Sequence, residues 1–299
     1  MRPILLLGKD GQVGWELQRS LAALGPLVAY GRKECNLADL SRLKRVISEV
    51  QPRLVINAAA YTAVDRAEQE PELAMRVNGE APGVIAEEAR TLGAPLIHYS
   101  TDYVFDGEKA EPYIETDPTN PQSVYGTSKL AGEQAIARAG ARAIVFRTSW
   151  VFGEQGGNFV RTILRLAKER DALRVVADQV GAPTPAALIA DVTAYVIARL
   201  NIERWPEQSR ADIYHLTAAN PVTWHAFAVS IVTMARELGV DLRLTPAAIE
   251  PIPTEAYPLP AKRPKNSRMS CARLEQRFAL VMPDWQPYLE RTLRGIASV

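Results

Sequence analysis

The sequence is poor in cysteine, has no excess of either charge and contains no long hydrophobic run. Its 299 residues include only two cysteines, Cys35 and Cys271, which form neither a disulfide framework nor a metal-ligand spacing and suit a reducing cytoplasm. The 35 basic and 34 acidic side chains leave a net charge of +1, which argues against a nucleic-acid or membrane partner. The apolar run before Gly8 is too short for a signal peptide, and no stretch approaches a membrane span. We therefore expect a cytoplasmic protein.

Short apolar runs alternate with helix-length amphipathic stretches through the first half of the chain. The runs are PILLL, LVAY, RLVIN, PLIHYS and AIVFRTS. This rhythm predicts an α/β fold with a doubly wound, Rossmann-like parallel sheet. After about residue 150 prolines become frequent, which indicates a smaller, loop-rich C-terminal substrate lobe. We expect a dinucleotide-binding domain at 1–150 and a substrate-binding lobe at 151–299, with part of 170–220 returning to the first domain.

Three glycines follow the first predicted strand and open a helix. Gly8, Gly11 and Gly14 stand in the stretch ILLLGKDGQVGWEL. Glycine at these places allows a tight turn, close approach of a pyrophosphate to the backbone, and close packing of helix on strand. The helix N-terminus would supply free N–H groups for the phosphates. Although glycine-rich turns also occur for purely structural reasons, this context favours a dinucleotide site.

The end of the second predicted strand indicates which cofactor binds. Dinucleotide folds usually carry an acid there for the adenosine ribose, but this chain has Gly31 followed by Arg32 and Lys33. Two cations suit a 2′-phosphate, so we expect NADPH, with NADH as the alternative. These cations could instead solvate a loop, and the adjacent Glu34 weakens the signal. After the third strand, the small side chains of 58–60 (Ala58, Ala59 and Ala60) would let a cofactor lie against the strand end.

Tyr125 and Lys129 lie one helical turn apart in VYGTSKLAGE. A lysine ammonium on the same helix face would lower the pKa of a tyrosine hydroxyl and fit it for proton transfer. The pair alone is weak evidence, because such spacings arise by chance. Its position after the glycine loop and after the fourth strand would bring these features together at the carboxyl edge of the sheet, where ligands of open α/β sheets bind.

With these motifs in place, the sequence resembles the extended short-chain dehydrogenases/reductases, and among them the dTDP-4-dehydrorhamnose reductases. The resemblance spans nearly the whole chain. The matching blocks, in order, are GKDGQVGWEL, NAAAYTAVDRAE, HYSTDYVFDG, VYGTSKLAGE, FRTSWVFG, DQVGAPT, AYPLPAKRPKNSRM and FALVMPDWQ. The late blocks are more specific than the Tyr-Lys pair, which the whole superfamily shares.

The resemblance implies a catalytic triad of Thr101, Tyr125 and Lys129. Tyr125 would protonate the oxygen at sugar C4 as hydride arrives from the nicotinamide, and Lys129 would hold the nicotinamide ribose and stabilise the phenolate. Thr101, with Ser100 as the nearby alternative, would hydrogen-bond the keto oxygen. The other implied contacts are Gly11, Gln12 and Val13 with the pyrophosphate, Asn36 and Leu37 with the adenine, Ala60, Tyr61 and Thr62 on the other side of the cofactor, and Asp102 and Trp150 with the sugar nucleotide.

The chain departs from the family pattern in two places. Many relatives carry an acid where this chain has Gly31, which weakens the case for NADH. Some relatives are described as using Mg²⁺ at a dimer contact built from glutamates; Glu16 matches, but Ala187 and Gly295 stand at the other sites. We therefore expect no metal site, and a homodimer remains open.

Several other features have a structural interpretation beside a functional one. The basic run Lys262, Arg263, Lys265, Arg268 and Arg273 could be a solvated face or could clamp the diphosphate of a nucleotide sugar, with Arg263 the best candidate. Asp178 and Gln179 are expected to shape a loop, the three histidines to be structural, and Trp224 and Phe227 to be core residues.

The leading hypothesis is an NADPH-dependent reduction of dTDP-4-dehydro-L-rhamnose to dTDP-L-rhamnose, the last step of dTDP-rhamnose synthesis. One alternative is a nucleotide-sugar epimerase or dehydratase on the same fold, which would recycle its hydride. Another is a non-catalytic regulatory subunit of methionine adenosyltransferase, against which the intact Thr101, Tyr125 and Lys129 argue.

Overall fold

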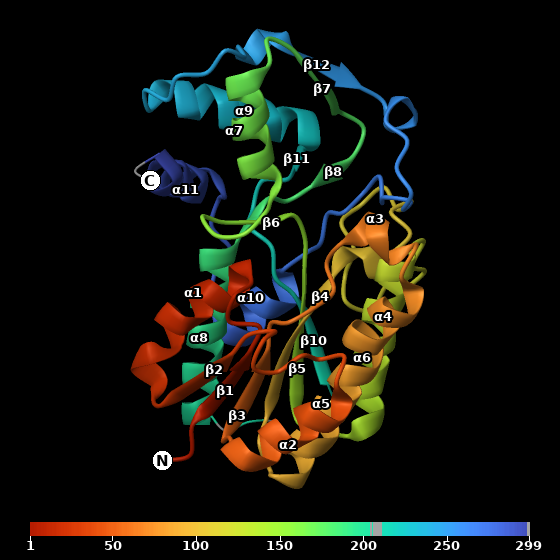
Figure 1. Ribbon diagram of the computed structural model, residues 1–299, viewed down its shortest axis with the longest axis vertical. Helices are drawn as coiled ribbons and strands as arrows, with labels where there is room; N and C mark the ends of the chain where they lie inside the picture. Colours follow the sequence, from red (N-terminus) through yellow and green to blue (C-terminus); the bar gives the residue numbers. More distant parts are fainter. Residues whose placement is uncertain (204, 206–210, 298–299) are drawn as a thin grey trace.

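A six-stranded parallel sheet forms the centre of the computed structural model, which describes residues 1–203, 205 and 211–297 (Figure 1). Neighbouring strands pair in parallel throughout. The chain runs outward from β1 in both directions, so the order of strands reverses beside β1. Across the sheet the order is β10 (Ala211–His215), β5 (Ala143–Thr148), β4 (Leu96–Thr101), β3 (Leu54–Asn57), β1 (Ile4–Leu7) and β2 (Leu27–Tyr30).

Helices cover both faces of this sheet, because successive strand side chains point to opposite sides and both sides are apolar. In β1, Ile4 and Leu6 belong to one hydrophobic cluster, and Leu5 and Leu7 belong to another. The first face packs against α1 (Gln12–Leu21) and α8 (Ala186–Glu203); the second packs against α2 (Leu40–Val50), α5 (Ala81–Thr91) and α6 (Val124–Ala139). The predicted doubly wound α/β fold is confirmed.

A second lobe lies beyond the carboxyl ends of the strands (Figure 1). Its framework is the parallel pair β7 (Leu173–Val176) and β12 (Ile249–Ile252), against which α9 packs. The other α-helices and β-strands after residue 150 are β6 (Val151–Phe152), α7 (Phe159–Glu169), β8 (Val180–Gly181), β9 (Thr184–Pro185), β11 (Val222–Thr223), α9 (Trp224–Glu237), α10 (Ala272–Phe278) and α11 (Gln286–Ala297). The short helices α3 (Val64–Ala67) and α4 (Pro71–Met75) pack against α6, and α10 packs against β10. None of the described helices combines the length and apolarity that crossing a bilayer requires.

The chain passes between the two lobes more than once. After the first stretch of the second lobe, α8 packs against α1, and β10 pairs with β5 at the sheet edge. The hydrophobic cluster on the α1 face also continues into the second lobe, where it includes Phe227 and Ile249. One hydrophobic core is therefore continuous across the predicted domain boundary near residue 150. That boundary remains a prediction.

Candidate active site

The glycine loop between β1 and α1 fits closely against the end of β3. Gly8 has φ +91°, and a Cβ there would lie 2.5 Å from the Ala59 backbone nitrogen. A Cβ on Gly14 would lie 1.9 Å from the Gly8 carbonyl oxygen, so only glycine lets α1 approach the strand this closely. Gly11 caps α1 without a side-chain hydrogen bond, and the first turn carries no acid. The free N–H groups at this end form an anion-binding site.

A crevice of about 560 Å³ begins at this loop and runs along the carboxyl ends of the strands. Its lining includes most of the predicted cofactor contacts: Gly8, Gly11, Gln12, Val13, Arg32, Asn36, Leu37, Ala58, Ala59, Ala60, Tyr61, Thr62, Tyr125 and Lys129. The predicted Gly14 lies outside this lining and serves the packing of α1. The crevice spans the place where the strand order reverses, which is where dinucleotides bind in such sheets.

Tyr125 stands in the first turn of α6, at the inner end of the crevice. Ser123 caps this helix by accepting a hydrogen bond from the Gly126 nitrogen at 3.1 Å, which fixes where the helix begins. The Tyr103 ring meets the Tyr125 ring edge-on, with centroids 5.4 Å apart. Burial raises the pKa of the Tyr125 hydroxyl, and a hydrogen bond with Thr101 opposes this shift. Tyr125 therefore carries its proton at neutral pH.

Lys129 is buried beneath the crevice and contacts β4. Its Nζ donates to the Tyr99 carbonyl at 2.6 Å and lies 3.4 Å from Nε2 of His98. Burial lowers the pKa of Lys129 to about 8. From the sequence we expected this lysine to lower the pKa of Tyr125, but burial raises that pKa instead. The Lys129 ammonium donates to the Tyr99 carbonyl.

His98 in turn is oriented by Asn57 at the end of β3. The Asn57 Oδ1 accepts from the Ala59 nitrogen at 3.1 Å, so its Nδ2 faces Nδ1 of His98 at 3.1 Å and donates to it. Burial also lowers the pKa of His98 well below its ordinary value, so the ring is neutral.

Thr101 is the last residue of β4 and Asp102 follows it, and both interact with Tyr125. The Thr101 hydroxyl donates to Oδ1 of Asp102 at 2.9 Å and accepts from the Tyr103 nitrogen at 3.2 Å. Burial raises the pKa of the Asp102 carboxyl to about 6. Ser100, which we considered as an alternative to Thr101, lines the crevice with a buried hydroxyl that has no hydrogen-bond partner among the described residues.

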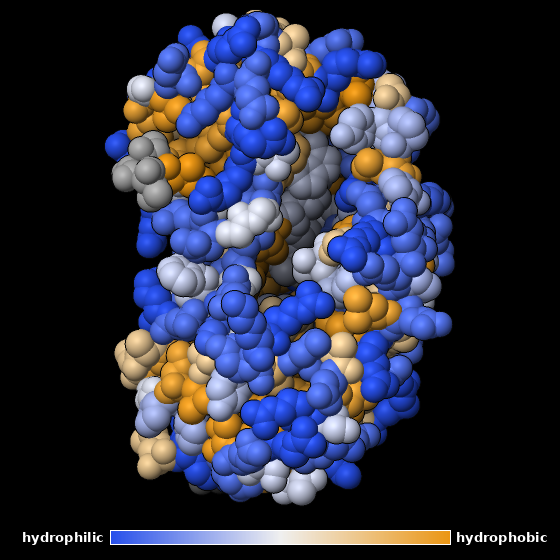
Figure 2. Space-filling model, viewed as in Figure 1, coloured by the Kyte–Doolittle hydropathy of each residue, from blue (hydrophilic) through white to orange (hydrophobic). Residues whose placement is uncertain are grey.

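A larger cavity of about 1230 Å³ lies between the second lobe and the loop that follows β4. Figure 2 shows the surface hollowed between the two lobes. Trp224 and Phe159 line this cavity from the second lobe. Trp150, in a left-handed conformation with φ +48°, stacks on Trp224 with ring centroids 3.4 Å apart. Phe227 is buried in the core as we expected, whereas Trp224 is half-buried, packs against the core from the cavity side and stacks on Trp150.

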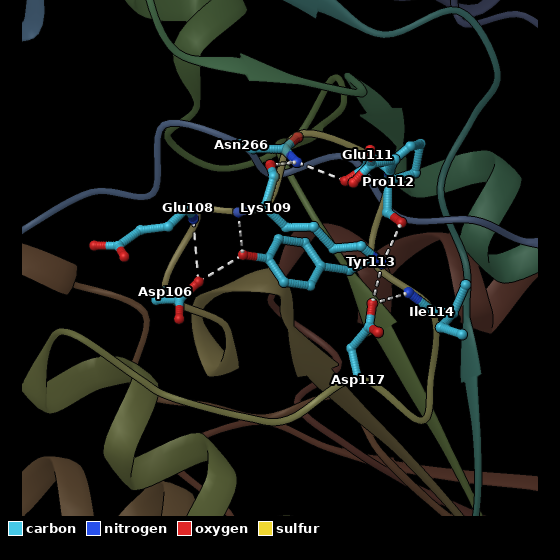
Figure 3. Close-up of polar contacts among 9 residues, drawn as sticks. All are labelled: Asp106, Glu108, Lys109, Glu111, Pro112, Tyr113, Ile114, Asp117 and Asn266. Atoms are coloured by element: carbon cyan, nitrogen blue, oxygen red, sulfur yellow. Dashed lines mark hydrogen bonds and ion pairs between the residues drawn. The ribbon is translucent and has the colours of Figure 1, made fainter.

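Residues 106–109 line the larger cavity, and hydrogen bonds connect the loop 106–117 that contains them (Figure 3). Tyr113 donates its hydroxyl hydrogen to Asp106 at 2.6 Å and accepts from the Lys109 nitrogen at 3.2 Å. Asn266, from the C-terminal basic segment, donates to the Lys109 and Glu111 carbonyls at 2.7 and 2.8 Å. These bonds join the loop after β4 to a segment that lies 157 residues later at Lys109 and Asn266.

Arg263 reaches the inner end of this cavity, where it is already paired. It donates to Oδ2 of Asp65 at 2.7 Å and to the Tyr103 hydroxyl at 3.0 Å. The same Tyr103 ring packs against Tyr125, so Arg263 is linked to the tyrosine of the crevice through one aromatic side chain. Asp178 and Gln179 hydrogen-bond Thr254, and they shape a loop as expected.

Sequence reasoning missed the residues that support the site from below. Asn57 and Asp65 were not assigned roles, and His98 was expected to be structural without its contact to Lys129. A polar residue inside an apolar strand, as at Asn57 and His98, is an unusual and readable signal. No sequence signal could have paired Asp65 with Arg263, because 198 residues separate them. Among residues 1–203, 205 and 211–297, no group of three or more His, Cys, Asp or Glu side chains could hold a metal ion.

Comparisons with known proteins give consistent results. The family model described as the RmlD substrate binding domain matches residues 1–297. The dTDP-4-dehydrorhamnose reductase of Burkholderia thailandensis is 49% identical over 295 residues, covering 99% of each chain. Among solved structures, the reductase of the same name from Clostridium acetobutylicum matches with a TM-score of 0.86 and 34% identity, covering 98% of each chain. That of Bacillus anthracis, solved in complex with NADP, matches with a TM-score of 0.85 and 33% identity, covering 98% of this chain and 99% of its own.

Proposed function

The chain belongs to the dTDP-4-dehydrorhamnose reductase family of NAD(P)-dependent oxidoreductases, and from this premise we propose its reaction. It reduces the C4 keto group of dTDP-4-dehydro-L-rhamnose to give dTDP-L-rhamnose, with NADPH preferred over NADH. The observation that carries the proposal is that protonated Tyr125 lines the same crevice as the glycine loop.

The crevice has the properties that a nicotinamide dinucleotide needs. The uncapped start of α1 offers N–H groups to the pyrophosphate. At the inner end, the buried hydroxyls of Ser100 and Thr148 line the crevice and have no partner among the described residues, so a polar ligand would satisfy them. When bound, the cofactor would supply the hydride that adds to C4.

Tyr125 would provide the proton for the oxygen at C4. A tyrosine with a raised pKa keeps its proton at neutral pH and so is an acid in its reactive form. Thr101, hydrogen-bonded to Asp102, would hold the Tyr125 hydroxyl in place, and Lys129 would contact the nicotinamide ribose. Once Tyr125 has given up its proton, a nearby ammonium would stabilise the phenolate.

The larger cavity would take the nucleotide sugar. Its lining combines aromatic rings with basic side chains, namely Phe159, Trp224, Tyr257, Lys262, Arg263, Lys265 and Arg268. Rings suit the base, and cations suit the diphosphate. Arg263 would have to exchange Asp65 or Tyr103 for a phosphate oxygen. Trp150 and Asp102, which the family resemblance assigns to the sugar, are not in the lining of either cavity, and they would have to reach the sugar from beside it.

The test is a product assay with purified protein and dTDP-4-dehydro-L-rhamnose, run separately with NADPH and NADH. We expect stoichiometric oxidation of the cofactor and formation of dTDP-L-rhamnose. Sugar conversion without net oxidation of the cofactor would support the epimerase alternative instead. Absence of both would support a binding module, and either result would reject the proposed reaction.

The preference for NADPH has its own test at Arg32, which lines the crevice next to Gly31. We expect Arg32→Ala to weaken NADPH binding more than NADH binding, by about tenfold, because the guanidinium would pair with the 2′-phosphate. Lys33→Ala is the matched control, since this neighbouring cation does not line the crevice. Equal losses for both cofactors in Arg32→Ala would exclude the proposed preference.

A further inference from the structure

Gly31 follows β2 at the position where dinucleotide folds usually have an acidic residue, and it has no side chain there. A Cβ built on Gly31 would lie 1.8 Å from Oδ2 of Asp10 and 3.1 Å from Oε2 of Glu34. The carboxylate of Asp10 therefore occupies the volume that the side chain of residue 31 would otherwise fill. An acid is present at the strand end after all, but it comes from the glycine loop.

The two carboxylates near Gly31 have different surroundings. Glu34 accepts from the Gly31 nitrogen at 2.9 Å and from Nζ of Lys9 at 2.7 Å, so its charge is paired and its geometry is fixed. Asp10 is exposed, and its side chain makes no hydrogen bond or ion pair with any described residue. Asp10 also lines the crevice, as do Gly31 and Arg32, whereas Glu34 does not. Asp10 is thus the carboxylate available to a bound molecule.

We propose that Asp10 replaces the strand-end acid and determines cofactor selectivity in opposition to Arg32. Its carboxylate accepts a hydrogen bond from the 2′-hydroxyl of the adenosine ribose in NADH, and it repels the 2′-phosphate of NADPH. Arg32 attracts that same phosphate. This inference rests on the proposed dinucleotide site, in which Arg32 favours NADPH and Asp10 limits that preference.

The experiment measures binding of adenosine 2′,5′-bisphosphate and of 5′-ADP by calorimetry, on wild type and on Asp10→Asn. These ligands report the ribose end of the crevice without any turnover of sugar. We expect Asp10→Asn to weaken 5′-ADP and to tighten the 2′-phosphorylated ligand, so that the ratio of the two dissociation constants shifts by about tenfold. An unchanged ratio overturns the proposal, as does failure of both ligands to bind the wild type.

Two controls separate position from charge. Asp39→Asn removes one negative charge from the same part of the lobe and preserves the cap of α2. Asp39 does not line the crevice, so the ratio of the two dissociation constants should stay at the wild-type value.

A double variant, Asp10→Ser with Gly31→Asp, returns the acid to the strand end. Gly31 is not among the glycines with positive φ, and Asp10→Ser removes the carboxylate that its Cβ would meet, so only a small shift of the Glu34 side chain is needed. This variant should recover the wild-type ratio; a ratio like that of Asp10→Asn overturns the proposal.

The outcome is independent of the reaction assigned above. If the ligand ratio responds to Asp10→Asn while the protein fails to reduce the sugar, then only the proposed reaction is rejected. If the sugar is reduced equally well with both cofactors in wild type and variant, and the ligand ratio does not move, then only the role of Asp10 is rejected.

Discussion

Lys129→Met is predicted to stabilise the fold at neutral pH while it abolishes turnover. Lys129 is 2% exposed, and burial lowers its pKa from 10.5 to about 8. In the unfolded chain the lysine keeps its ordinary pKa, so the unfolded chain binds this proton more tightly than the folded chain does. Charging Lys129 therefore costs folding free energy below pH 8, and this cost falls as the pH rises from 8 towards 10.5.

The size of the effect follows from the shift. A pKa lowered from 10.5 to about 8 corresponds to a cost of ~3 kcal/mol at pH 7 and ~1 kcal/mol at pH 10. Methionine keeps most of the side-chain volume but cannot donate to the Tyr99 carbonyl, and that loss costs ~1 kcal/mol. The net stabilisation by Lys129→Met should therefore be about 2 kcal/mol at pH 7 and about zero at pH 10.

The assay is urea unfolding of wild type and Lys129→Met at both pH values, together with turnover. Lys168→Met is the matched control, because this lysine is exposed on α7 and its replacement should have the same small effect at both pH values. The reasoning is refuted if the difference in unfolding free energy between wild type and Lys129→Met is the same at pH 7 and pH 10. A stabilised but inactive variant would show that the site is maintained at the expense of fold stability.

Three further predictions concern single contacts. Tyr125→Phe should lower turnover by roughly 10²–10⁴-fold and leave cofactor affinity intact in a fluorescence titration, since it removes only the acid; near-normal turnover would reject the assignment. Gly14→Ala should weaken dinucleotide binding by at least about tenfold, because its methyl group would meet the Gly8 carbonyl and displace α1; unchanged affinity would contradict this close approach. Glu133→Ala should lower the free energy of unfolding in urea by about 3 kcal/mol, because it leaves the buried Arg147 charge unpaired. Adding Arg147→Met to this variant should restore much of the loss. A double variant less stable than the single one would rule out this explanation.

Much of the sheet and the outline of the crevice could be predicted, because both depend on short-range patterns. Each of the five predicted apolar runs coincides with one of the strands β1 to β5 to within a residue at each end, since a buried parallel strand must be apolar on both faces. The glycine loop, Tyr125 and Lys129 could be placed on one edge because parallel strands bring their carboxyl ends together. The direction in which the pKa of Tyr125 shifts could not be predicted, because it depends on how deeply the hydroxyl is buried.

By itself the sequence determined the succession of strands and helices in the first half of the chain, the dinucleotide loop and the family to which the chain belongs. These features depend on local periodicity and on motif spacing. Only the tertiary structure decided which partners the functional side chains have: Asp65 for Arg263, Tyr99 and His98 for Lys129, and Asp10 for the volume beside Gly31. The physical reason is that hydrogen bonds, burial and charge act through space, so they depend on which distant segments the fold brings within a few ångströms of one another.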